Sequence, residues 1–119
     1  MQRRHRLKKS AEFQRVRAQR QSWAHPLMVL YVAPNDLDIT RVGISTTKRL
    51  GKSVARNRMK RLIREAARSF LPAMATGRDL VFAARGGAAE ASYQQVRVAM
   101  ENLLGRARLL PRSPTPPHR

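Results

Sequence analysis

The sequence predicts an α+β fold in which a four-stranded sheet packs with helices in the order α-β-β-β-α-β-α. Two kinds of apolar spacing predict it: short strand-like segments and longer segments with helical periodicity. A length of 119 residues suits one domain. We place that domain at residues 1–110. The remaining residues, 111–119, read PRSPTPPHR and predict a disordered proline-rich tail.

The first helix is expected to begin near Ser10, a residue type that caps helix N-termini. Glu12 falls in its first turn, and Phe13 and Val16 lie on one face. A short first strand follows at 21–24.

Three further segments are predicted strands. Residues 27–33 are apolar on both faces, and the turn formers at 34–36 end them. Residues 41–46 alternate, and residues 79–85 form the fourth strand.

The last helix follows a capping box of Ser92 and Gln95. Its expected apolar face consists of Tyr93, Val96, Met100, Leu103 and Leu104.

Charge indicates the class of partner. The chain has 25 Lys and Arg against 7 Asp and Glu, a net charge of +18. Such an excess opposes compaction, so a polyanionic partner explains it best. The sequence contains no Cys, which excludes disulfides, cysteine zinc sites and a thiol nucleophile. The basic N-terminus lacks the apolar run of a secretory signal, and no stretch is long enough to span a membrane. We therefore expect a soluble, cytoplasmic protein.

The segment 51–68, GKSVARNRMKRLIREAAR, begins like the end of a nucleotide-binding P-loop. That motif requires a glycine five positions before its second glycine, where this chain has Thr46. A β-branched residue does not readily adopt the backbone of a phosphate cradle. The segment is better explained as a turn that leads into a helix.

This helix separates apolar from basic residues. The apolar stripe comprises Met59, Leu62, Ile63, Ala66 and Phe70. An adjoining arc holds Lys60, Arg61, Arg64 and Arg68, and Arg56 and Arg58 lie near the helix start. Cations at a helix N-terminus oppose the helix dipole, whereas phosphates would satisfy both the arginines and the free N–H groups. Only Glu65 offers a counter-charge within the helix. The pattern favours RNA or DNA phosphates over a merely solvated face.

Catalytic groups are not evident. His5, His25 and His118 are isolated, and the seven acidic residues are scattered. A two-metal nuclease would need clustered carboxylates. We therefore predict no catalytic and no metal-binding residue on this chain.

An ordered set of motifs resembles the protein subunit of bacterial ribonuclease P. The set consists of RLKKSAEF at 6–13, RVGIS at 41–45, KRLG at 48–51 and ARNRMKRLIRE at 55–65. The resemblance implies a four-stranded sheet like a domain of ribosomal protein S5, with a left-handed β-α-β crossover. It also implies that a large RNA subunit, with Mg²⁺ held mainly by RNA, removes the 5′ leader of precursor tRNA. The protein would bind that RNA and the leader, without a cofactor of its own.

The resemblance implies two surfaces. The contact with the catalytic RNA would comprise Arg56, Asn57, Arg58, Lys60, Arg61, Arg64, Arg68, Lys48, Arg49 and Lys52. A leader cleft between the first helix and the sheet would comprise Lys9, Phe13, Arg17, Val29, Tyr31 and Gly43. Family members often have an aromatic residue at the position of Arg17, so the stacking on that side is expected to differ.

Three other functions compete with this interpretation. A ribosomal or other rRNA-binding protein of similar fold would match the size and charge equally well. A DNA-binding architectural protein would need a recognition helix that the sequence does not show. A self-sufficient nuclease would need the catalytic cluster that is missing.

Overall fold

The computed structural model describes residues 2–19 and 21–110, and the predicted tail at 111–119 lies outside the described residues. The predicted order of elements is confirmed. The helices and strands are α1 (Ser10–Ala18), β1 (Ser22–Ala24), β2 (Met28–Pro34), β3 (Arg41–Ser45), α2 (Ser53–Phe70), β4 (Arg78–Ala84) and α3 (Tyr93–Arg106). Short 3-10 helices connect them: η1 (Arg3–His5), η2 (Lys48–Leu50), η3 (Leu71–Ala73) and η4 (Gly86–Glu90). None of the helices in the described ranges is long and apolar enough to cross a membrane.

The four strands form one mixed sheet in the order β1-β2-β4-β3. β4 is antiparallel to β2 and parallel to β3. The last strand in the sequence therefore lies between two earlier strands. Parallel neighbours require a crossover, and α2 supplies it between β3 and β4. The left handedness of this crossover stays a prediction of the resemblance.

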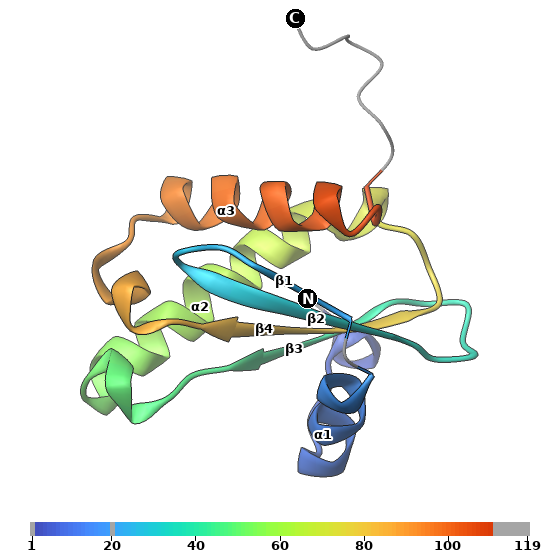
Figure 1. Cartoon of the computed structure of the whole chain (residues 1–119), viewed down its shortest axis with the longest axis horizontal. Helices are drawn as coiled ribbons and strands as arrows, with labels where there is room; N and C mark the ends of the chain where they lie inside the picture. Colours follow the sequence, from blue (N-terminus) through green and yellow to red (C-terminus); the bar gives the residue numbers. More distant parts are fainter. Residues whose placement is uncertain (1, 20, 111–119) are drawn as a thin grey trace, which may run out of the picture.

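Helices cover the two faces of the sheet unequally. α2 and α3 lie on one face and α1 lies alone on the other (Figure 1). Alternation along β2 explains both layers: Met28, Leu30 and Val32 join the larger core under α2 and α3, whereas Tyr31 and Ala33 point toward α1. This continuous apolar run was predicted from the sequence. Its side chains toward α2 and α3 are buried, whereas Val29 and Tyr31 on the other face are half-buried.

Most of the predicted helix faces are confirmed. On α2, Met59, Ile63, Ala66 and Phe70 are buried, and Leu62 is partly buried. The buried face of α3 comprises Val96, Ala99, Met100, Leu103 and Leu104.

The predicted helix caps were partly right. The Ser92 hydroxyl accepts the Gln95 N–H at 3.1 Å, as expected. The prediction for Tyr93 was wrong: it is 37% exposed, because the first residue of α3 lies beyond the core. At α1, Ser10 is the first helical residue rather than the cap. The Glu12 carboxylate accepts N–H groups that precede the helix and so takes over the capping.

The smaller core, between α1 and the sheet, is thin. Its fully buried members are Leu7, Val16, Ala33 and Val81. Val16 is the single buried residue of α1. Apolar packing alone therefore gives this nine-residue helix little to hold it against the sheet.

An ion cluster around Asp79 of β4 supplies the missing attachment. Asp79 is fully buried. Arg41 of β3 donates Nε to Oδ1 at 2.9 Å and Nη2 to Oδ2 at 2.8 Å. Arg15 of α1 also binds Oδ2, and Asn35 donates Nδ2 to Oδ1 at 2.8 Å. Arg41 further donates Nη1 to Oε2 of Glu12 at 3.1 Å. Two residues of α1 are thereby joined to two strands.

The pKa of Asp79 reflects this environment. Burial acts to raise it, but hydrogen bonds from Arg41 and Asn35 and the charges of Arg41 and Arg15 outweigh burial and hold the pKa below its ordinary value. Ionised Asp79 therefore stabilises the fold fully above the pKa of an unfolded aspartate, about 3.9. That contribution is lost as the pH falls through the lower pKa of the folded state.

We expect Asp79→Asn to destabilise the fold, because it leaves two arginines facing a buried neutral amide. The loss should be roughly 2–4 kcal/mol, somewhat below the usual cost of breaking a buried pair, since both arginines are partly solvated. Denaturant unfolding at pH 7 measures it. Asp38→Asn, an equal change of charge at an exposed site, should be nearly neutral. Equal stabilities of the two variants would contradict the role of the cluster.

Candidate nucleic-acid interface

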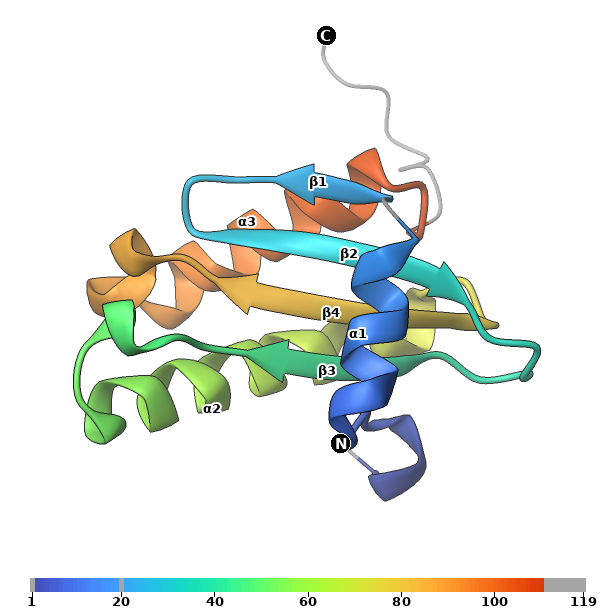
Figure 2. The same cartoon turned by 60° about the horizontal axis from the view of Figure 1, so that its bottom comes forward.

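α1 covers only part of its face of the sheet, and an open strip remains beside it. Figure 2 shows α1 crossing β2, β4 and β3 near one end. In the register of the sheet, Tyr31, Val81 and Gly43 form the row that α1 crosses. The next row, of Val29, Ala83 and Ser45, is half-buried. This uncovered row is the floor of the predicted leader cleft.

Two predicted cleft residues touch directly. A Cβ on Gly43 would lie 2.6 Å from Cζ of Phe13, so only glycine leaves room for this ring. Phe13 and Tyr31 are both half-buried and pack against the smaller core. Each therefore packs against the core and also keeps a surface that faces solvent.

Arg17 extends the line of Phe13 one turn further along α1. Its Nη2 donates to Ser45 Oγ at 2.9 Å, and its Cζ lies 5.4 Å from the centre of the Tyr31 ring. The side chain thus spans from β3 to β2 over β4. Lys9, the other predicted cation, is exposed at the N-cap of α1.

The predicted contact with the catalytic RNA lies on α2 and the turn before it. Arg49 and Lys52 are exposed, and the side chain of Lys48 lies outside what the structure describes. The first turn of α2 contains no acidic side chain. Its N-cap residue, Lys52, makes no side-chain hydrogen bond to the helix. Along the described part of α2 one ion pair occurs, from Arg68 to Glu65 at 2.7 Å. The other cations of this helix therefore keep their charge available for phosphates. They are Arg56, Arg58, Lys60, Arg61 and Arg64.

Arg58 differs from its neighbours because it has a structural partner. Its Nη1 and Nη2 donate to the carbonyls of Ala89 and Ala91 at 3.3 and 2.9 Å. These carbonyls belong to η4 and the residue after it, which lead into α3. Helical spacing placed Arg58 with the other cations near the start of α2. In the structure Arg58 also holds the connection from η4 to α3 in place. Arg56 donates to Gly51 O at 3.5 Å, a longer contact.

The two predicted surfaces meet at the edge of β3, where the N-terminal segment pairs with Val42. A pocket of about 220 Å³ opens there. Its lining includes Phe13 from the cleft, Lys60 and Arg64 from α2, and Lys8. The sequence suggested two separate surfaces, whereas the fold makes them continuous around the edge of the sheet.

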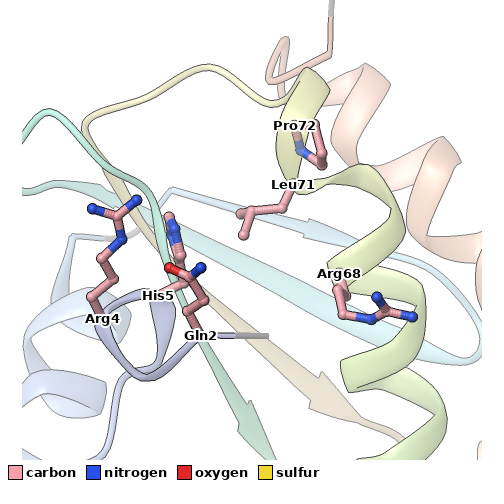
Figure 3. A pocket seen from close by; sticks show the side chains of 6 residues that line it. All are labelled: Gln2, Arg4, His5, Arg68, Leu71 and Pro72. Atoms are coloured by element: carbon pink, nitrogen blue, oxygen red, sulfur yellow. The ribbon is translucent and has the colours of Figure 1, made fainter.

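Another pocket lies elsewhere on the molecule. It has a volume of about 670 Å³ and lies between η1 and the end of α2. Figure 3 shows that Arg4 and His5 reach it from one side and Leu71 and Pro72 from the other. Nδ1 of His5 lies 2.9 Å from Thr40 O, so this side chain contacts the backbone just before β3. Arg4 and Arg68 extend the basic surface toward the N-terminus.

Some residues of the site were missed from the sequence. Gln14 and Ser45 line a pocket beside Arg17, and Arg15 and Glu12 hold α1 in the ion cluster. Helical spacing from Arg17 could have suggested Gln14, three residues earlier on the same face, but nothing in the sequence indicated that Glu12 and Asp79 share Arg41. Within the described residues, no group of three His, Cys, Asp or Glu side chains could hold a metal ion.

The sequence model of the ribonuclease P family matches residues 1–108. The chain belongs to this family. The ribonuclease P protein component of Herpetosiphon aurantiacus is 42% identical over 109 residues, which cover 92% of this chain and 89% of that protein. The corresponding protein of Caldanaerobacter subterraneus is 43% identical over 98 residues, covering 82% and 84%.

Solved structures of the ribonuclease P family share the fold. The ribonuclease P protein of Staphylococcus aureus superposes with a TM-score of 0.82 at 33% identity, covering 90% of this chain and 98% of that one. The protein of Thermotoga maritima, in complex with 1-(4-fluorophenyl)-2-thiourea, gives a TM-score of 0.78 at 29% identity, covering 84% and 97%. The chain is thus a protein component of ribonuclease P, a ribonucleoprotein endonuclease of tRNA processing.

We expect Arg58→Ala to destabilise the fold more than Arg61→Ala. Arg58 loses two charge-assisted hydrogen bonds to carbonyls, at roughly 1.5–3 kcal/mol in all. Arg61 is exposed and its loss should cost less than about 0.5 kcal/mol. Thermal melting of the two variants measures the difference. Indistinguishable melting temperatures would show that Arg58 contributes nothing to the η4 connection.

Proposed function

We propose that this chain binds the catalytic RNA of ribonuclease P through α2 and the 5′ leader of precursor tRNA through the cleft beside α1. The observation that carries the proposal is the continuity of the two surfaces at the β3 edge. Cations of α2 that have no carboxylate partner in the described structure run into the pocket lined by Phe13. A substrate strand and the RNA that cleaves it can therefore contact one protein at adjacent places.

Each surface suits its proposed partner. Phosphates of a folded RNA neutralise the arginines of α2 and accept from the free N–H groups of its first turn. A single-stranded leader stacks its bases on Phe13 and Tyr31, and stacking does not depend on the base. Catalysis belongs to the RNA subunit in this proposal, with Mg²⁺ held mainly by RNA. The chain would act in the cytoplasm, where it meets precursor tRNA.

The proposed contact with the catalytic RNA can be tested through its salt dependence. Replacing Arg56 and Arg61 with Ala should weaken binding, and each lost phosphate contact should lower the log–log slope against salt by about 0.7–0.9. Arg58 is left in place because it supports the fold. The control is Arg78→Gln with Arg108→Asn, which removes the same charge away from α2. Asn tolerates the positive φ of 61° at position 108. Equal slopes for the two double variants would exclude α2 as the contact.

The leader cleft can be tested by substituting Tyr31 with Leu, which keeps apolar packing but removes the aromatic face. In the assembled holoenzyme, we expect affinity for precursor tRNA to fall by roughly 1–3 kcal/mol, the value of one stacked base. Mature tRNA lacks the leader, so its affinity should not change. The measurement is the ratio of the two dissociation constants, alongside a melting curve. A normal ratio with a lowered melting temperature would assign Tyr31 to the core alone.

A further inference from the structure

A second pocket opens beside Arg17, between α1 and the end of β3. Its volume is about 310 Å³, at the lower limit of small-ligand sites, which suits a single nucleotide. The lining side chains come from four positions of α1, from one residue before it and from β3. They are Lys8, Ser10, Phe13, Gln14, Arg17 and Ser45.

The guanidinium of Arg17 is held in place but keeps most of its donors. Tyr31 packs against it and Ser45 accepts one of its five N–H groups. In the described structure no other partner takes the remaining four. The nearby acids are already engaged, since Asp79 and Glu12 both bind Arg41. Arg17 is exposed, so these donors can bind acceptors of a ligand.

The surroundings favour a base over a phosphate as that ligand. Arg17 lies over the floor of the cleft, between Tyr31 and Ser45, where the faces of stacked bases would lie. Lys8 and Lys9 are exposed at the N-terminal end of α1, where a sugar-phosphate backbone would pass in solvent. Gln14 adds a neutral amide to the same pocket, and amides hydrogen-bond base edges.

Guanine fits this donor set. It presents two adjacent acceptors, O6 and N7, and arginine binds both at once. Adenine places its N6 donor beside N7, which opposes a group that only donates. We propose that Arg17 makes this pocket a guanine site for one position of the precursor tRNA leader. The proposal rests on the leader-binding function proposed above and adds base selectivity to it.

The test uses the holoenzyme assembled from the full chain and the catalytic RNA. A precursor tRNA with an all-adenine leader is compared with a series in which a single guanine moves through the leader. We expect one position at which guanine binds about 5- to 150-fold more tightly than adenine, the range of one bidentate contact. At that position 7-deazaguanine, which lacks the N7 acceptor, should lose most of the gain.

Two variants assign the preference to Arg17. Arg17→Gln keeps a polar side chain but loses the charge and the paired donors, so the guanine preference should disappear. Arg17→Phe should also lose it while retaining leader binding through stacking. Arg78→Gln, an equal loss of charge at an exposed site on β4, should keep the preference.

Other outcomes would overturn the proposal. A guanine preference that persists in Arg17→Gln would place the readout elsewhere. Equal weakening of all leaders by Arg17→Gln, with a lower salt slope, would make Arg17 a phosphate contact. If no guanine position is preferred while precursor still binds more tightly than mature tRNA, the guanine site is wrong and leader binding stands. Equal binding of precursor and mature tRNA by the unaltered holoenzyme would refute both.

Discussion

The buried carboxylate of Asp79 is the interaction on which the rest of the site depends. α1 buries one side chain, so apolar packing does not fix where this helix lies. Asp79 stands on β4, between β2 and β3, and binds arginines from α1 and β3. That position sets how α1 crosses the sheet, with Phe13 over Gly43 and Arg17 over Tyr31. The geometry of the cleft therefore follows from an ion cluster that contacts no part of its floor.

The few acidic residues of the chain explain how a protein of net charge +18 both folds and binds RNA. Glu12 and Asp79 hold α1 to the sheet, and Glu65 pairs with Arg68 along α2. The first two neutralise cations where the fold needs a buried or half-buried contact. Elsewhere the positive charge is left facing outward. The acidic residues thus stabilise the fold, and the excess positive charge remains available to bind phosphates.

The spacing of apolar residues predicted the helices and strands because each type of element has its own period of buried side chains. It could not predict that β4 inserts between β2 and β3, since spacing within a strand carries no information about its neighbours. The same limit applies to Arg58: its place on α2 followed from helical geometry, but the carbonyls of η4 reach it only through the tertiary fold. Among the residues that the family resemblance placed in the cleft, Phe13 contacts Gly43 and Arg17 lies over the Tyr31 ring. The resemblance carried tertiary information that composition lacked.

The family resemblance implies where Arg17 lies in the cleft, but the chemistry of its side chain differs from that of an aromatic residue. An aromatic residue at this position would offer a π-face that accepts any base. A guanidinium offers directed donors, which distinguish acceptor-rich edges from others. A long flexible side chain normally loses affinity when it is ordered on binding. Tyr31 and Ser45 already order the Arg17 side chain in the free protein. The entropy of ordering this side chain is therefore lost during folding and not on binding. Arg17 therefore places a preorganised hydrogen-bond donor where family members often have an aromatic ring.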